Sequence, residues 1–395
     1  MHRLQLSVFT VILLSLSASQ TGCVAHQADE DDSDQLGPEG KADDSRSVSD
    51  AAIFSGTGPS TLRIEAPFAP AFSAARAGEP DGFFPQPRVK EPFAGTMIYK
   101  QGRKEIRIPI ELTVRGNSSL QECAFPKLKV KAAKPAVAGT VFEGVHNFKI
   151  GTHCGEGGSG TIGRLRNQTA AWREALVYRI AAAAALPTLA VRPLTITYVD
   201  TAAANATVTR KAFLLEHIEL AAKRYGGEAL EDPEQWQGDP QAEMGADVIA
   251  QIHLLQALVG NWDWDIGAPG AGRVLWNTEA VKSPGGMLPI AADFDLASMV
   301  TRDWLKAETL DVLPAERDVH VRQAAHYLAT GAGASLPIAA LLRARDHFVA
   351  KRAAIEAAAA SGPIDATGRK NAQEHVRVFY LALAQLEAVL AAQPQ

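Results

Sequence analysis

The hydrophobic pattern of the chain changes from strand-like to helical past its midpoint, and this change constrains the fold more than any other feature. From about Leu62 to Asp200, apolar and polar residues alternate in short runs typical of β-strands, interrupted by one helix-like stretch. From residue 246 onward, apolar residues recur at helical spacing. With 395 residues, 47% of them hydrophobic, the chain can bury a sizeable core. We therefore predict an α+β protein with a strand-rich lobe over residues 61–220 and a helical lobe over residues 221–395.

Short segments of the first lobe carry clear strand and helix signals. Residues 95–116 predict two strands joined by a turn at "KQGRK", and in "FPKLKVKA" the apolar Leu128 and Val130 alternate with three lysines. The alanine-rich stretch 166–186 predicts a helix, and two further strand-like runs follow it. The first helix of the second lobe is expected to stop at Gly260, since glycine commonly ends helices.

The first sixty residues are expected to direct and tether the chain. Residues 1–23 combine a short basic start, an apolar run too brief to span a membrane comfortably, and small residues before Cys23. This resembles a bacterial lipoprotein signal peptide in which Cys23 becomes the lipid-bearing first residue; a plain secretory signal cleaved nearby is the alternative. Residues 24–60 are rich in Asp, Ser and Gly and predict a disordered acidic tether. We therefore expect an exported protein, anchored by its lipid to a membrane of the bacterial cell envelope or else secreted.

Charge and cysteine content narrow the possible partners. The formal net charge is −5 and the sequence has no sustained basic block, which argues against nucleic acid as a ligand. After the signal peptide only Cys123 and Cys154 remain, and in an oxidising compartment an isolated pair is most simply a disulfide. A metal site formed by Cys154 with His153 and His146 is the rival interpretation.

Four aspartates in two short motifs are the first candidates for chemistry. Asp263 and Asp265 lie in "GNWDWD" directly after an apolar helical run, and Asp293 and Asp295 lie in "DFD" after a short apolar run. Carboxylates at the ends of such elements can meet in a cleft and hold Mg²⁺, which prefers hard oxygen ligands. Ordinary capping and turn acids are the alternative. The glycine-rich stretch 155–163 lacks the "GK[ST]" ending of a phosphate loop, so we expect a flexible loop there.

Basic residues on predicted strands supply a second set of candidates. "RGNSS" (residues 115–119) and "FPKLKV" precede Arg173 and Glu174 on the predicted helix. In kinase-like folds a strand lysine pairs with a helical glutamate, and its ammonium group points at the nucleotide phosphates. Lysines on the surfaces of strands are common, so it is the order of these pieces that favours a kinase-like site.

In this order, the pieces resemble the CotH spore-coat family. The motifs are "RGNSS", "PKLK", "WRE", "LLE", "GNWD" and "DFD", spread over about residues 96–300. CotH proteins are atypical protein kinases. The resemblance therefore implies a two-lobed kinase-like fold that transfers the γ-phosphate of ATP, with Mg²⁺ or Mn²⁺, to Ser or Thr of a surface or coat protein. It implies Asp263 as the catalytic aspartate, Arg115, Asn117, Lys129, Glu174 and Glu216 around the nucleotide, and Asp293 as the metal-binding aspartate, with Asp295 and Asp265 as further candidate metal ligands.

One position departs from the family pattern. CotH proteins carry an asparagine just before the strand that leads to the metal aspartate, whereas this chain has Gly272 or Arg273 near that place. Asp265 or Asn277 can substitute, and Asp295 can share the ion. The departure leaves open a pseudokinase, an envelope lipoprotein that binds a ligand or partner without turnover. A metal-dependent hydrolase is a third interpretation, but no histidine stands near the aspartates in the sequence, and dinuclear hydrolytic sites commonly recruit histidine ligands.

Overall fold

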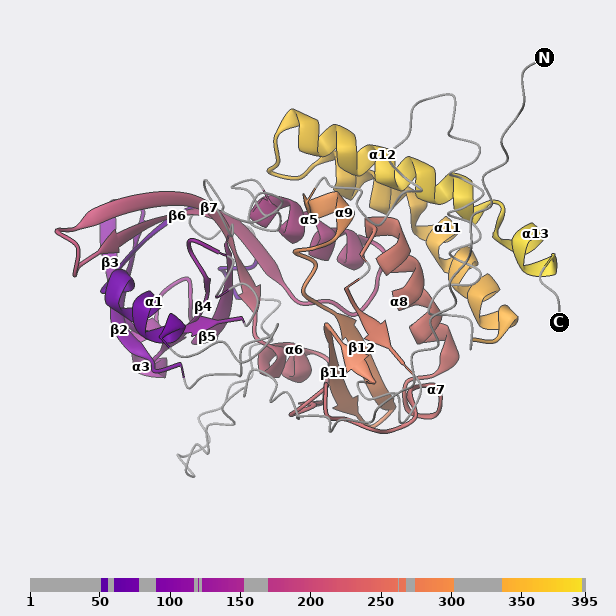
Figure 1. Ribbon diagram of the computed structural model, residues 1–395, viewed down its shortest axis with the longest axis horizontal. Helices are drawn as coiled ribbons and strands as arrows, with labels where there is room; N and C mark the ends of the chain where they lie inside the picture. Colours follow the sequence, from indigo (N-terminus) through magenta and orange to yellow (C-terminus); the bar gives the residue numbers. More distant parts are fainter. Residues whose placement is uncertain are drawn as a thin grey trace, which may run out of the picture.

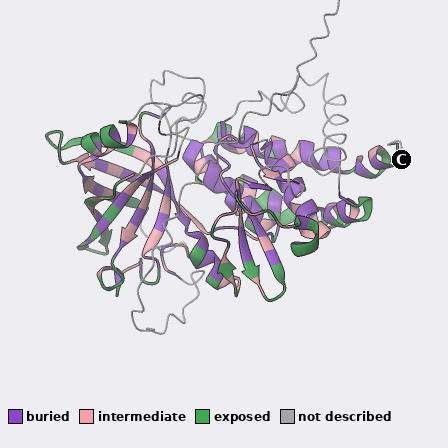
Figure 2. Cartoon of the chain, turned by 60° about the horizontal axis from the view of Figure 1, so that its bottom comes forward, coloured by how far each residue is buried: buried purple, intermediate pink, exposed green. Residues whose placement is uncertain are grey.

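The protein has two lobes with separate hydrophobic cores, a β-barrel and a mainly helical lobe (Figure 1). The fold is therefore α+β, as predicted. Strands and helices toward the middle of the molecule are mostly buried, whereas the outward turns of the barrel are exposed (Figure 2). The computed structural model describes residues 51–55, 60–77, 90–116, 120, 123–152, 170–261, 263–267, 274–301 and 336–392.

Seven strands close the barrel of the first lobe. They are β1 (Thr61–Ala66), β2 (Phe93–Gln101), β3 (Lys104–Arg115), β4 (Lys127–Ala132), β5 (Asn147–Thr152), β6 (Val191–Asp200) and β7 (Ala206–Glu216). Around the barrel their order is β1-β2-β3-β4-β5-β7-β6, with β1 parallel to β6 and the other neighbours antiparallel. Two helices, α1 (Phe68–Arg76) and α3 (Lys134–Val137), also contact β3.

The barrel interior is lined by the apolar faces that the alternating pattern predicts. Leu128 and Val130 of β4 are fully buried in its core, so the alternating lysines of that strand face outward. The predicted hairpin is confirmed, with its turn at Gly102, whose φ of +64° suits glycine. Ile53, which the sequence assigns to the tether, is also fully buried in this core, and its N–H donates to Val141 O at 3.1 Å. Part of the predicted tether therefore packs onto the barrel.

The predicted helix of the first lobe is α5 (Ala170–Ala183), and it lies between the two lobes (Figure 1). Although it sits between β5 and β6 in the sequence, its buried residues belong to the core of the helical lobe. It contacts β6 and β7 of the barrel as well as α9 (Ser298–Thr301) and α11 (Ile338–Ala360). Because α5 touches both cores, its position affects how the lobes face each other.

The second lobe contains the predicted helices but also strands that were not predicted. Its helices are α6 (Ile218–Arg224), α7 (Pro240–Glu243), α8 (Ala246–Val259), α9, α11, α12 (Ala366–Leu383) and α13 (Leu386–Ala391). The stop of α8 at Gly260 is confirmed, with φ +65°. Strands β8 (Glu228–Ala229), β11 (Thr278–Ser283) and β12 (Gly286–Ala291) form one sheet, and β9 (Asp265–Ile266) pairs with β10 (Leu275–Trp276). The prediction of a helical lobe missed these strands, because β8, β9 and β10 have only two residues each and β11 and β12 do not strictly alternate buried and exposed residues.

Among the described helices, none is both long enough and apolar enough to cross a membrane.

Candidate active site at the junction of the lobes

A lysine of the barrel forms ion pairs with two aspartates of the helical lobe. Lys127 Nζ lies 2.7 Å from Asp293 Oδ1 and 2.6 Å from Asp295 Oδ2. The side chains of Lys127 and Asp295 are 10% and 9% exposed, and that of Asp293 is 40% exposed. Buried charges such as those of Lys127 and Asp295 are tolerated only when paired. The junction is therefore held by a buried cation between two carboxylates.

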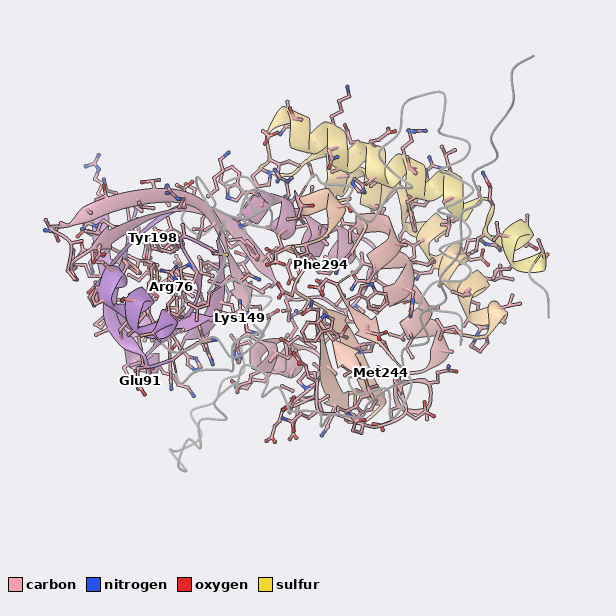
Figure 3. The ribbon with its side chains drawn as sticks, in the orientation of Figure 1. Arg76, Glu91, Lys149, Tyr198, Met244 and Phe294 are labelled. Atoms are coloured by element: carbon pink, nitrogen blue, oxygen red, sulfur yellow. The ribbon has the colours of Figure 1, made fainter. Side chains whose placement is uncertain are left out.

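The lysine in this position is Lys127, whereas the CotH resemblance points to Lys129. Both lysines face outward from β4, two residues apart, so the sequence pattern does not distinguish them. Lys129 lies opposite Lys149 of β5, and Lys149 Nζ is 3.2 Å from Glu279 Oε1 of β11. Lys149 lies on the barrel side of the junction and Phe294 on the helical side (Figure 3). The outer faces of β4 and β5 thus meet acidic residues of the other lobe at two places.

Asp293 occupies a strained backbone position directly after β12. Its φ is +50°, a left-handed conformation that is uncommon for a residue with a side chain. The backbone N–H of Asp293 donates to the hydroxyl of Tyr178 at 3.2 Å. The next residue, Phe294, is fully buried and meets the Tyr178 ring edge-to-face, with centroids 5.0 Å apart. Strain of this kind persists only when the surroundings hold it, and it concentrates at functional sites.

The loop after α8 holds Asp263 through hydrogen bonds on both its side chain and its backbone. The Asp263 N–H donates to Asn261 Oδ1 at 3.2 Å, and Asn261 Nδ2 donates in turn to Gln256 Oε1 at 3.0 Å. Trp276 Nε1 donates to Asp263 Oδ1 at 2.9 Å, and Asn277 Nδ2 donates to Asp263 O at 2.6 Å. Asp263 is thereby fixed without an ion pair in any of these contacts.

Asn277 connects the Asp263 loop to the Asp293 segment. While its side chain binds Asp263 O, its backbone oxygen accepts from Ala292 N at 3.1 Å. Asn277 also has a positive φ, +48°, which asparagine tolerates better than most residues. Asn277 therefore links the loop that carries Asp263 to the segment that leads into Asp293. Asn277 is one of the two residues that the sequence offered as a substitute for the family asparagine.

The loop that follows α8 and the segment that follows β12 also meet at Gly260. Ser298 N donates to Gly260 O at 3.0 Å, and a Cβ added at Gly260 would lie only 2.9 Å from Ser298 Cβ. Only glycine fits both this close approach and the positive φ of the helix stop. The glycine before "NWD" thus sets the distance between the two acidic loops.

Asp265, the other offered substitute, lies on β9 opposite Trp276. It is half-buried, and burial raises the pKa of its carboxyl above the ordinary value. Trp264, the residue before Asp265, is buried and packs edge-to-face against His253.

Glu174 and Arg115 lie close enough to Tyr178 to affect its ionisation. Burial raises the pKa of Tyr178 well above its ordinary value, the charges of Glu174 and Asp293 raise it further, and Arg115 lowers it. Glu174 is itself buried, one helical turn before Tyr178 on α5. Arg115 lies opposite Lys127 on the neighbouring strand. Together with the Lys149–Glu279 pair, the described part of the junction therefore collects at least three cations and four carboxylates.

Glu216 lies at the end of β7, where the chain passes from the barrel to α6. Its side chain is fully buried and accepts hydrogen bonds from Arg224 Nη2 at 2.6 Å and from Ala190 N at 2.8 Å. The location agrees with a segment linking the lobes. The carboxylate, however, serves a buried ion pair, so nothing in its contacts favours the predicted role beside an adenine.

Several predicted positions lie outside the described residues. Cys123 is disulfide-bonded, while the predicted partner Cys154 lies outside that part of the chain. Within the described residues, no group of three or more His, Cys, Asp or Glu side chains is placed to hold a metal ion. The other positions outside are Cys23, Asn117, His153, residues 155–163, and Gly272 and Arg273.

Comparison with known proteins gives little further guidance. No protein-family model and no curated protein matches the chain. Among solved structures, the chain is similar to one from the complex of the toxin–antitoxin system HipA, HipB and its operator DNA from Shewanella oneidensis MR-1, with 11% sequence identity and a TM-score of 0.32. The match covers 75% of this chain and spans 65% of the length of that one. A TM-score this low carries no argument, and the resemblance to CotH stays a prediction.

Proposed function

We propose that this protein is an exported, kinase-like phosphotransferase, related in fold to CotH proteins, that transfers the γ-phosphate of ATP to Ser or Thr of a surface or coat protein. The observation that carries the proposal is the placement of Lys127 between Asp293 and Asp295 across the junction of two lobes. Phosphoryl transfer requires mainly positioning and neutralisation of charge, which such a junction can supply.

Two residues at the junction, Asp293 and Asn277, carry oxygen atoms of the kind that a divalent cation prefers. Asp293 presents a partly exposed carboxylate, and the side-chain amide of Asn277 donates an N–H to the backbone oxygen of Asp263, which leaves the amide oxygen as the atom that would coordinate the ion. Mg²⁺ or Mn²⁺ held by these two oxygens would neutralise charge on the phosphates. Asp295 is buried against Lys127, a position suited to hold the lysine or to share the ion.

The remaining roles follow from the same geometry. Lys127, and Arg115 on the neighbouring strand, would contact phosphate oxygens. Because Trp276 binds Asp263 Oδ1, Oδ2 is the oxygen that would accept the proton of the attacking hydroxyl. The hydroxyl oxygen then bonds to the γ-phosphorus as the bond to the ADP oxygen breaks. We assign the phosphate role to Lys127 in place of Lys129.

One observation favours a second candidate, the pseudokinase. Lys127 already binds both carboxylates, so the junction is closed by its own charges. A protein of this kind would bind a ligand or partner in the envelope without turnover.

Transfer of labelled phosphate tests the proposal. Residues 24–395 are incubated with γ-labelled ATP, Mg²⁺ or Mn²⁺ and a general protein acceptor, alongside Asp263→Asn and Asp293→Asn. Asp346→Asn, at an exposed site on α11, is the matched control. We expect transfer by the wild type and the control, and a loss of about 100-fold or more in both site variants. Metal-dependent ATP binding without transfer would favour the pseudokinase, and the absence of both would refute the kinase-like site.

A further inference from the structure

Tyr178 of α5 contacts two consecutive residues, Asp293 and Phe294, of the segment that follows β12. Its hydroxyl accepts the backbone N–H of Asp293, and its ring packs edge-to-face on Phe294. Tyr178 itself is 1% exposed and lies in the middle of α5, in the core of the helical lobe. One rigid side chain thus holds both the backbone and the neighbouring ring of this turn.

The turn needs such support. Asp293 has φ +50°, a conformation that costs a residue with a side chain free energy and is kept only when its surroundings enforce it. The part-buried N–H group of Asp293 also needs an acceptor, and here the tyrosine oxygen provides it. Burial and the nearby carboxylates raise the pKa of Tyr178, so the hydroxyl stays neutral over the physiological pH range. A neutral hydroxyl accepts the N–H without placing another anion beside the carboxylates.

Helix α5 also holds the far end of the same segment. The fully buried Arg173 donates from Nε to Val300 O, seven residues after Asp293. The segment from Asp293 to Val300 is therefore fastened to α5 at both ends. Any displacement of α5 relative to the barrel would carry the Asp293 carboxylate with it, away from Lys127.

We propose that Tyr178 is a positioning residue, which holds the Asp293 carboxylate in the direction required for it to bind a divalent cation. The inference rests on the proposed function, since it concerns the same metal site. It goes further because it makes the affinity for the metal depend on Tyr178 of α5, a residue that does not itself touch the metal.

Tyr178→Phe tests this inference, with Tyr198→Phe as the matched control. Both tyrosines are fully buried, but the Tyr198 hydroxyl, in the barrel lobe, makes no hydrogen bond among the described residues. Mn²⁺ titrations in the presence of ATP, followed by transfer rate and by Mn²⁺ binding, are made well below the melting temperature of every variant. We expect Tyr178→Phe to raise the apparent Kd for Mn²⁺ about tenfold, the effect of losing one buried hydrogen bond. Tyr198→Phe should match the wild type.

Rescue separates positioning from a purely structural role. Saturating Mn²⁺ should restore transfer by Tyr178→Phe to near the wild-type rate, since the ligands are intact, but should not restore Asp293→Asn. An unchanged Mn²⁺ titration in Tyr178→Phe, or an equal change in Tyr198→Phe, would overturn the inference while leaving the proposed function standing. If the wild type binds neither Mn²⁺ nor ATP, the proposed function itself fails and the inference falls with it.

Discussion

Replacing Lys127 by methionine tests the junction directly, because methionine keeps an unbranched apolar stem and removes only the charge. In the wild type the ammonium group lies 2.7 Å from Asp293 and 2.6 Å from Asp295. Removing one partner from a buried ion pair costs about 3–5 kcal/mol, since the remaining charge is left unpaired. Asp293 is 40% exposed and can be hydrated, whereas Asp295 cannot. We therefore expect a loss near the lower limit, about 3 kcal/mol of unfolding free energy.

The assay is thermal and urea unfolding, followed by circular dichroism. For a chain of 395 residues, with an unfolding entropy of about 2.1 cal/mol/K per residue, a loss of about 3 kcal/mol corresponds to a fall of roughly 4 °C in melting temperature. Lys129→Met is the control, because Lys129 faces the same way on β4 and is the lysine to which the family motif points. It is only half-buried, and we expect it to cost at most about 1 kcal/mol.

A second experiment asks whether the two carboxylates left without a cation cause the loss of stability. Adding Asp293→Asn and Asp295→Asn to Lys127→Met should recover most of the stability, because neutral amides need no counter-ion. Equal losses in Lys127→Met and Lys129→Met would refute the reasoning, since the junction would then not depend on a desolvated cation. Failure of the double replacement to recover stability would show that packing, and not charge, is responsible.

Two further predictions concern the loop spacing and acid sensitivity. Gly260→Ala should lower the free energy of unfolding in urea by about 3 kcal/mol, because its Cβ would lie 2.9 Å from Ser298 Cβ at φ +65°. Gly226→Ala is the control: with φ +70° and nothing within 4 Å, it should cost only about 1–2 kcal/mol. Equal losses in the two variants would contradict the proposed role of Gly260 in spacing the loops. Burial lowers the pKa of His253 to about 4 and that of His375 to about 3. The unfolded chain therefore binds protons first, so stability is full above about pH 6.5 and falls below it by about 1.4 kcal/mol per pH unit for each histidine, down to its folded pKa. His253→Phe should remove part of this slope, and a flat profile between pH 6.5 and 4.5 would contradict the prediction.

The lysines of β4 show what a local pattern can and cannot predict. Alternation in "PKLKVKA" correctly gives a strand with its apolar residues inside the barrel and its lysines outside. Which lysine is buried depends on where the helical lobe covers the barrel, and no local pattern contains that information. The sequence therefore predicts the face but not the residue.

The asparagine illustrates a different limit. Spacing taken from the family pattern led to Gly272 or Arg273, whereas the structure joins the two acidic loops through Asn277. Asn277 follows β10 and has a positive φ, so its place depends on how the β9–β10 pair turns into β11. A pair of two-residue strands leaves no clear signal in the sequence, which is part of the reason why the sequence predicts only helices in the second lobe.

Under the proposed function, the ion pair that joins the lobes also affects how metal and nucleotide bind. A divalent cation alone would have to displace Lys127 from Asp293, which would leave a buried ammonium group with fewer partners. Phosphate alone would draw Lys127 away and leave Asp295 buried without a cation. When metal and nucleotide bind together, the aspartates bind the metal in place of Lys127. Lys127 in turn binds phosphate oxygens in place of the aspartates. Every buried charge then keeps a partner, so the geometry favours cooperative binding of the metal–nucleotide complex over binding of either component alone.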